Sequence, residues 1–348
     1  MIPVPCKAGD LVEVRSAAEI FATLDDQGCL ERLPFMPEML QYCGRRYKVA
    51  ASAHKSCDST YFGLGRAMTN AVFLEDLRCD GSAHDGCEAR CLLFFKLEWL
   101  KPVSPSRNWH LASGLSGARS GSRDTGWLKA TVKRNAGDTE ITYRCQATEH
   151  LNSTTTFESN AWSMFVADVR SRNASVGEIV RAMSLLFVRR LQGLPFGWRL
   201  WTATYEALHR AYYGTRGPYF EGTVPSGQPT PEVRTNLQSG DVVRVRTLDE
   251  ISSTLNHRSN RNRGLSFNME MSPFCGGVYR VERRVTRIVD EKSGRMLQMK
   301  GPCIMLEGGH CKARYHPDAV LCRRKIPQYF REAWLERVEA PKGSRESS

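Results

Sequence analysis

The sequence lacks most of the features that assign a function directly. It has no apolar run approaching the roughly 20 residues that a membrane-spanning helix needs. Its first residues, MIPVPCKAGDLVEV, have neither the basic start nor the apolar core of a secretion signal. No P-loop, dinucleotide-binding fingerprint, nucleophile elbow or HExxH pattern occurs. The first two absences predict a cytoplasmic protein. The missing motifs do not exclude an enzyme, because most active sites are assembled from residues distant in sequence.

The overall composition excludes disordered and fibrous classes. Of the 348 residues, 41% are hydrophobic and 25% are charged, which are ordinary values for globular proteins. Because domains average roughly 100–200 residues, we expect two or three of them.

Positive charge is concentrated in the later parts of the chain. The formal net charge is +12. Residues 9–103 hold 11 basic and 14 acidic side chains, a net −3, whereas residues 104–234 hold 16 and 10, a net +6. Residues 240–338 hold 19 and 11, a net +8. An anionic partner is therefore expected to prefer the last two thirds.

An internal duplication organises the chain. Residues 9–15, GDLVEVR, align with residues 240–246, GDVVRVR. The pattern Leu-x-Phe-x-x-Glu-Met-x-x-x-Cys-Gly-x-x-Tyr-x-Val occurs at 33–49 and again at 265–281. Order and spacing persist over about a hundred residues, so the sequence predicts two homologous copies of one module.

Chemically distinctive residues recur at matching positions of the two copies. An offset of 232 residues relates Glu38 to Glu270, Cys43 to Cys275, Cys79 to Cys311 and His84 to His316. After three further residues are inserted, an offset of 235 relates Cys87 to Cys322, Lys96 to Arg331 and Trp99 to Trp334.

Each copy has the pattern of a small β-rich unit. Alternating apolar residues predict an opening strand at 11–15 and at 242–246. A capping-box spacing that begins a short helix follows each strand, in the pairs Ser16 with Glu19 and Thr247 with Glu250. Short curled strands around a small core predict an SH3-like barrel, although another small β-barrel fits the pattern equally well.

The region between the copies differs in character. Residues 104–126 are rich in Ser and Gly and predict a flexible tether, and 127–147 predict a hairpin. Amphipathic spacing predicts helices at about 175–192 and 199–213. Residues 222–231 predict a second linker.

The predicted fold class is α+β and multidomain, with two homologous small β-barrel (SH3-like) modules that flank a mainly helical middle region. The predicted segments are a first Cys-rich β module at 1–103, a linker, hairpin and two-helix region at 104–234, a second Cys-rich β module at 235–339, and a disordered tail at 340–348.

An aromatic stripe lies on the second predicted helix. Trp198, Trp201, Tyr205 and Tyr212 recur at helical spacing. Such a stripe is suited to a partner or a membrane interface, but burial against the neighbouring amphipathic helix is the favoured interpretation.

The twelve cysteines are the strongest chemical signal. In a chain without a secretion signal, clustered thiols are more often metal ligands or catalytic groups than disulfides. Zinc takes four thiolate or imidazole ligands in a tetrahedral site. The candidate ligands are Cys43, Cys57, Cys79, His84, Cys87 and Cys91 in the first copy, and Cys275, Cys303, Cys311 and Cys322 in the second.

Two zinc sites, one in each copy, are the prediction from these residues, and iron–sulfur clusters on the same thiolates are the alternative. Two other interpretations compete with metal binding. The cysteines could instead be inert, buried, small apolar side chains, or they could serve disulfide or redox chemistry.

Several segments resemble a family of uncharacterised bacterial proteins with a duplicated Cys-rich module. The likeness lies in FMPEMLQYCG (35–44), LRCDGSAHDGCEARC (77–91) and MKGPCIMLEG (299–308), and more loosely in YRCQATE (143–149). Members of that family tend to lie near genes for surface-polysaccharide synthesis. The resemblance implies a link to that pathway and assigns no catalytic residue.

Three functions are consistent with the sequence. The favoured one is a cytoplasmic, non-catalytic binding or accessory protein that engages a protein or polysaccharide-pathway partner. The alternative is a metal- or iron–sulfur-dependent enzyme acting on a small substrate. The third, a barrel protein associated with nucleic acid, is not favoured, because few aromatic residues interleave with the basic clusters.

Overall fold

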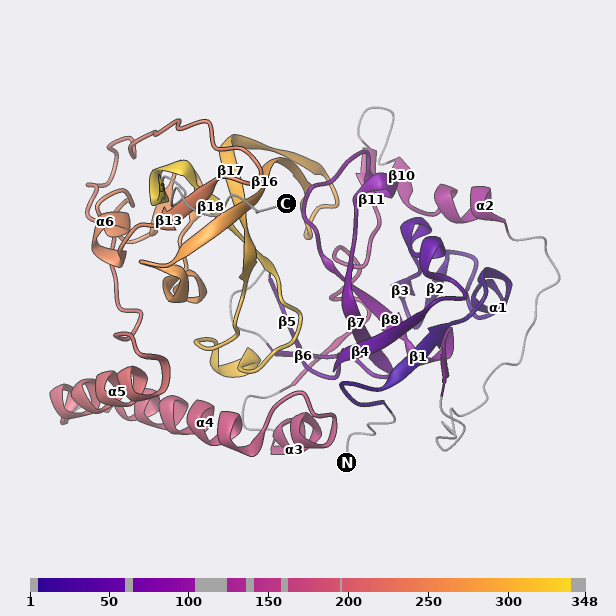
Figure 1. Cartoon of the computed structure of the whole chain (residues 1–348), viewed down its shortest axis with the longest axis horizontal. Helices are drawn as coiled ribbons and strands as arrows, with labels where there is room; N and C mark the ends of the chain where they lie inside the picture. The colour runs from indigo at the N-terminus through magenta and orange to yellow at the C-terminus, as the bar shows by residue number, and fades with distance from the viewer. Residues whose placement is uncertain are drawn as a thin grey trace, which may run out of the picture. The chain divides into compact units, whose positions relative to one another are not determined.

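The computed structural model describes residues 6–59, 65–103, 124–135, 141–157, 162–194 and 196–338 (Figure 1). The predicted tail at 340–348 and nearly all of the predicted tether at 104–126 fall outside these ranges. The chain forms two compact units. Unit 1 comprises Met1–Leu208, Arg287–Leu297 and Lys312–Ile326, and unit 2 comprises His209–Thr286, Gln298–Cys311 and Pro327–Ser348.

The two repeats fold into five-stranded sheets of matching strand order. In the first repeat the order is β8-β7-β4-β1-β9, from β1 (Leu11–Val14), β4 (Arg46–Ser52), β7 (Ala71–Arg78), β8 (Leu92–Lys96) and β9 (Leu100–Pro102). In the second the order is β18-β17-β16-β13-β19, from β13 (Val242–Val245), β16 (Val278–Val289), β17 (Met296–His310), β18 (Pro327–Arg331) and β19 (Leu335–Arg337). Each strand thus has a counterpart in the other copy.

The remaining strands are short. They are β2 (Cys29–Leu30) with β3 (Leu33–Pro34), β5 (Ser56–Cys57) with β6 (Gly65–Ala67) and β12 (Thr155–Thr156), β10 (Lys133–Asn135) with β11 (Ile141–Tyr143), and β14 (Arg261–Asn262) with β15 (Leu265–Ser266). The last pair belongs to the second repeat, as β2 and β3 belong to the first.

Short helices also correspond between the copies. The α-helices α1 (Ala17–Phe21) and α6 (Leu248–Ser252) both begin at the predicted capping boxes. The 3-10 helices pair as η1 (Pro37–Tyr42) with η4 (Met269–Phe274), η2 (Ser82–His84) with η5 (Pro317–Ala319), and η3 (Leu97–Trp99) with η6 (Glu332–Trp334). Hydrogen bonds from side chain to backbone fix the starts of α1 and α6, as the spacing predicts.

Four helices lie between the repeats: α2 (Thr125–Ala130), α3 (Trp162–Arg170), α4 (Val176–Leu191) and α5 (Trp198–Tyr213). Both long predicted helices are confirmed, and α4 begins at a capping box of Ser175 and Glu178. No helix in the described part of the chain is long and apolar enough to cross a membrane. On α5 the predicted burial holds for Tyr205 but not for Trp198, which is exposed.

A tryptophan occupies the same place in both cores. Trp99 packs edge-on against Phe35 with ring centroids 5.2 Å apart and an interplanar angle of 79°. Trp334 and Phe267 repeat both values. Each indole N–H donates to a threonine hydroxyl, at 3.1 Å from Trp99 to Thr23 and at 3.0 Å from Trp334 to Thr254. The duplication therefore extends from sequence to side-chain packing.

A buried cation also recurs at the end of the fourth strand. Lys96 donates to the carbonyl oxygen of Thr69 at 3.0 Å and pairs with Glu31. Its counterpart Arg331 donates to the carbonyl oxygen of Gly301 at 2.7 Å. Both long side chains thus hydrogen-bond backbone carbonyl oxygens of their own repeat.

The prediction of two SH3-like barrels is wrong. Strands make up 30% of the structure and helices 27%, and the described residues form open sheets without two closed barrels. In the first sheet a side chain occupies the free edge of β8. The amide of Gln146 bonds both the N–H of Phe94, at 2.8 Å, and its carbonyl oxygen, at 2.9 Å. A closing strand would need these same backbone groups, so the edge is capped by a side chain and not by another strand.

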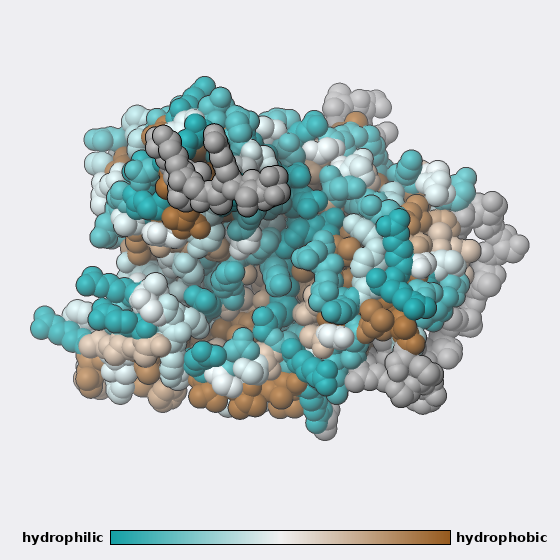
Figure 2. Space-filling view, in the orientation of Figure 1, coloured by the Kyte–Doolittle hydropathy of each residue, from teal (hydrophilic) through white to brown (hydrophobic). Residues whose placement is uncertain are grey.

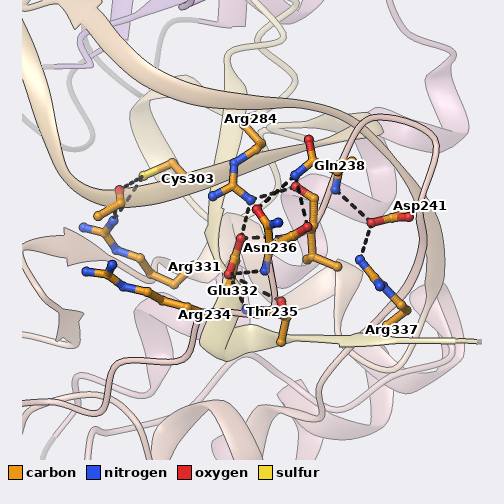
Figure 3. A network of polar contacts seen from close by, with 12 residues as sticks. Arg234, Thr235, Asn236, Gln238, Asp241, Arg284, Cys303, Arg331, Glu332 and Arg337 are labelled. Atoms are coloured by element: carbon orange, nitrogen blue, oxygen red, sulfur yellow. Dashed lines mark hydrogen bonds and ion pairs between the residues drawn. The ribbon is translucent and has the colours of Figure 1, made fainter.

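Glu332 anchors the segment that leads into the second sheet (Figure 3). Its buried carboxylate accepts the backbone N–H of Thr235 at 2.6 Å and that of Asn236 at 3.2 Å. Arg284 donates to the same carboxylate at 2.6 Å and to the carbonyl oxygen of Leu237 at 2.7 Å. The first repeat has Leu97 at the matching position, so this anchor is specific to the second copy.

Glu332→Gln is expected to lower the free energy of unfolding by about 2 kcal/mol, because the amide cannot accept all of these hydrogen bonds and leaves Arg284 without its charge partner. Urea denaturation measures the change. Glu336→Gln is the matched control, since Glu336 forms an exposed ion pair with Arg244 that should contribute little. Equal midpoints for the two variants would contradict the anchoring role.

Candidate metal centre and buried thiols

Three potential ligands of different chemistry converge in the first repeat. One ligand atom each from Glu38, Cys79 and His84 lies within 4.8 Å of the other two. The Cys79 thiol donates to Glu38 Oε1 at 3.2 Å, and its sulfur lies 3.9 Å from His84 Nδ1. Glu38 and His84 are buried, and Cys79 is half-buried. This is the one group of three or more such residues in the part of the chain that the structure describes.

Separate elements bring the three side chains together. Glu38 lies in the first turn of η1, Cys79 directly follows β7, and His84 ends η2. The tight loop between Cys79 and His84 requires glycine at position 81, where φ is +77°. A Cβ there would lie 1.9 Å from the carbonyl oxygen of Cys87, so no other residue fits without rearrangement.

Burial controls the protonation of all three groups. It raises the pKa of Glu38 above its usual range. Burial is also the main reason why the pKa of the Cys79 thiol is strongly raised, and the nearby Glu38 and Cys91 add to the effect. Burial lowers the pKa of His84 to about 4, against smaller opposing effects of Asp80 and the Arg144 backbone. At neutral pH the imidazole therefore keeps a free lone pair, and the thiol keeps its proton.

Two atoms of the group have no hydrogen-bond partner among the described residues. They are Glu38 Oε2 and His84 Nε2, both buried. An unpaired buried polar atom costs roughly 1–3 kcal/mol, so such atoms are rare without a reason. Carboxylate oxygen, thiolate sulfur and imidazole nitrogen are all zinc ligands, and the donor set therefore fits that ion.

The other predicted ligands of the first copy are not members of this group. Cys43 ends η1, and burial raises the pKa of its thiol. Cys87 Sγ accepts the backbone N–H of Val289 at 3.3 Å. Cys91 contributes its carbonyl oxygen to the backbone N–H of Cys79 at 2.8 Å, and burial raises the pKa of its thiol.

The predicted ligands of the second copy are dispersed. Cys275 ends η4, where burial raises its pKa to about 12. Cys303 is buried, and its sulfur accepts from Arg331 Nη1 at 3.4 Å (Figure 3). Cys311 directly follows β17 and is half-buried. Cys322 lies in unit 1, with Cys57.

The local chain explains why only one repeat groups its glutamate, cysteine and histidine. In the first copy His84 is the last residue of η2, whereas in the second His316 precedes the first residue of η5. Lys312 stands where the first copy has Asp80, so a cation replaces a carboxylate beside the cysteine. The positive charge of Lys312 beside Cys311 disfavours a metal ion in the second copy.

Cys57 and Cys322 form a second group with a buried arginine in unit 1. Arg324 Nη1 donates to the carbonyl oxygen of Cys57 at 3.0 Å, and the Arg324 backbone N–H lies 3.4 Å from Cys322 Sγ. The guanidinium also pairs with Glu291 at 3.0 Å. A hydrogen bond from Cys322, helped by the charge of Arg324, lowers the pKa of Cys57 despite its burial.

Sequence reasoning missed a buried ionic group that fastens α3. Lys55 donates to Asp168 and, at 3.2 Å, to the carbonyl oxygen of Val320. His54 Nε2 lies 3.1 Å from Asp168 Oδ1, without the alignment of a hydrogen bond. His54, Lys55 and Asp168 are all buried. The one available signal was Asp168 itself, a carboxylate on the apolar side of a helix, which needs a buried partner.

A buried histidine contacts Ser56, the residue between Lys55 and Cys57. His150 Nε2 lies 2.7 Å from the hydroxyl of Ser56. Burial is the main reason why the pKa of His150 lies well below its usual range, and the positive charges of Arg324 and Arg66 add to the effect. The imidazole is thus neutral in the folded protein at neutral pH.

No family model, curated protein or solved structure matches the chain.

Cys57 is expected to react with iodoacetamide at pH 7 about tenfold faster than Cys43, which is also half-buried but has a raised pKa. Cys322→Ala should slow this reaction, because it removes the hydrogen bond that stabilises the thiolate. Cys303→Ala is the control, since that thiol contacts Arg331 and not Cys57. Mass spectrometry of timed samples measures each rate, and similar rates at Cys57 and Cys43 would refute the assignment.

His150 is expected to make stability depend on pH. Its pKa is lower in the folded chain than in the unfolded one, so the unfolded chain binds the proton first as pH falls below about 6.5. The stabilisation is present above that pH and is lost progressively below it. His150→Gln should reduce the slope of unfolding free energy between pH 7 and pH 5, measured by urea denaturation. A slope equal to that of the native protein would contradict this role of His150.

Proposed function

We propose that the chain is a non-catalytic binding protein that depends on one zinc ion held by Glu38, Cys79 and His84. The observation that carries the proposal is the convergence of these three ligand atoms within 4.8 Å, with Glu38 Oε2 and His84 Nε2 otherwise unpartnered. A bound ion would pair with buried groups that are costly to leave alone. It would also fasten the loop after β7 to η1.

The resemblance of residues 35–44 and 77–91 to the family near surface-polysaccharide genes supports a partner from that pathway. Glu38 lies in the first of these segments, and Cys79 and His84 lie in the second. In this proposal the zinc ion shapes the surface that the partner meets and takes no part in a reaction.

A metal-dependent enzyme is the second candidate, and one observation favours it. Catalytic zinc sites use three protein ligands and keep a fourth position for water or substrate, whereas structural sites usually use four. Glu38, Cys79 and His84 together offer three ligands. The burial of Glu38 and His84 weighs against it, because a substrate must reach the metal.

The repeat supplies the matched controls for the metal test. Glu38→Gln, Cys79→Ser and His84→Gln should each reduce the zinc content of the purified protein from about one ion per chain to near none. The counterparts Glu270→Gln, Cys311→Ser and His316→Gln change the same residue types 232 positions later and should leave the content unchanged. Elemental analysis of the anaerobically purified protein gives the values, and circular dichroism checks that each variant folds.

Two outcomes would overturn the proposal. One is a native protein without zinc, and the other is loss of zinc from the second-copy variants instead of the first. Cobalt substitution separates the two candidate functions, because azide should change the visible spectrum of bound cobalt only if a coordination position is open.

Zinc affinity is expected to rise with pH. The raised pKa of Cys79 means that the ion must displace a proton from the thiol, and Glu38, whose pKa is also raised, adds to this effect. Calorimetric titration of the metal-free protein in buffers of different ionisation enthalpy measures the protons released. Affinity that is independent of pH between 6 and 8 would exclude the thiol as a ligand.

A further inference from the structure

Helix α3 exposes apolar side chains along one side. Trp162, Val166 and Val169 follow helical spacing, and Trp162 is 67% exposed. On the opposite side Met164, Phe165, Ala167 and Asp168 are buried. The helix is therefore already packed on its inner side, and its outer side presents a second apolar surface that is open to solvent in the described part of the chain.

Helix α4 continues this surface. Val176, Val180 and Phe187 fall within an arc of about 40° at 3.6 residues per turn, and Phe187 is 64% exposed. The inner side of the same helix buries Ala182, Leu185 and Val188. Two consecutive helices thus each bury one side and expose an aligned row of apolar side chains on the other. Single exposed apolar residues are common on protein surfaces, but an aligned row on both helices forms a patch.

The turn between α4 and α5 adds the most exposed aromatic residue of the surface. Phe196 is 80% exposed, and Leu194, Trp198 and Leu200 are also open to solvent. Figure 2 shows brown residues along the lower edge of the molecule, where Figure 1 places α3, α4 and the start of α5. We call the exposed apolar side chains of residues 162–200 the apolar face.

The charge around the apolar face is positive. Residues 162–200 contain six arginines but only two acidic residues, Asp168 and Glu178. Asp168 is buried against Lys55, and Glu178 serves the capping box of α4. Arg181, Arg190 and Arg199 are exposed. A partner that covers this region must accept both apolar contact and positive charge.

We propose that the apolar face docks on an anionic phospholipid membrane. Exposed Trp and Phe beside Arg are typical of helices that lie in the membrane interface, with aromatic rings at headgroup depth and cations on the phosphates. A second copy of the chain is a poorer occupant, because a symmetric contact would bring the arginines of both copies together. The helices lie along the surface, since none is able to span the bilayer.

Sedimentation with lipid vesicles tests the proposal on the full chain. Binding is expected to vesicles of phosphatidylcholine with phosphatidylglycerol, to be weak to phosphatidylcholine alone, and to fall as salt rises. The double variant Phe187→Ser/Phe196→Ser should bind at least tenfold more weakly. Arg190→Gln/Arg199→Gln should lose the preference for anionic lipid.

The control is a double change of exposed apolar residues elsewhere. Val278 in β16 and Leu297 in β17 are 58% and 45% exposed, so Val278→Ser/Leu297→Ser makes a comparable chemical change outside the apolar face. This variant should bind vesicles as the native protein does. Zinc content should be the same in all of these variants, which separates this proposal from the metal site.

Three outcomes would overturn the proposal. One is the absence of binding to anionic vesicles, and another is binding that Phe187→Ser/Phe196→Ser leaves unchanged. The third is a dimer, seen by sedimentation velocity without lipid, that the same variant converts to monomer. That result would assign the apolar face to a contact between two copies.

Discussion

The edge-on contact between Phe35 and Trp99, repeated by Phe267 and Trp334, is the constraint on which both sheets depend. The tryptophan sits between the fourth and fifth strands in sequence, and the phenylalanine precedes the 3-10 helix that carries the conserved spacing of Glu, Met and Cys within the repeat. Because the indole is fully buried and its N–H is bonded to a threonine, its orientation is fixed. The indole directly precedes β9, the strand that pairs with β1, and so fixes the chain at the point where it re-enters the sheet.

Local and periodic features of the fold could be predicted from the sequence, whereas closure of the sheets could not. The capping boxes, the long helices α4 and α5, and the opening strands depend on residues a few positions apart, and they were confirmed. The barrel prediction was wrong because strand pattern alone does not say what occupies a sheet edge. Here it is the side chain of Gln146, about fifty residues away from Phe94 in the chain.

In the candidate metal site, too, sequence could identify residue types but not which side chains come together. Cys79 and His84 were predicted as ligands because cysteine and histidine are recognisable as such, and they lie together. Glu38 was not predicted as a ligand, although Glu270 repeats it, because the prediction considered only cysteine and histidine as ligands. Its significance comes from burial, which sequence does not show. The grouping of Cys57 with Cys322 was also beyond prediction, since each had been assigned to its own repeat.

Unit 1 incorporates segments of the second repeat, Arg287–Leu297 and Lys312–Ile326. Arg324 and Val320 complete the surroundings of Cys57 and Lys55, and Val289 donates to Cys87. After the duplication, the two copies thus ceased to be interchangeable parts. Removal of the second copy would leave buried charges and thiols of the first without their partners, so a truncated chain holding only the first copy is not a self-sufficient folding unit.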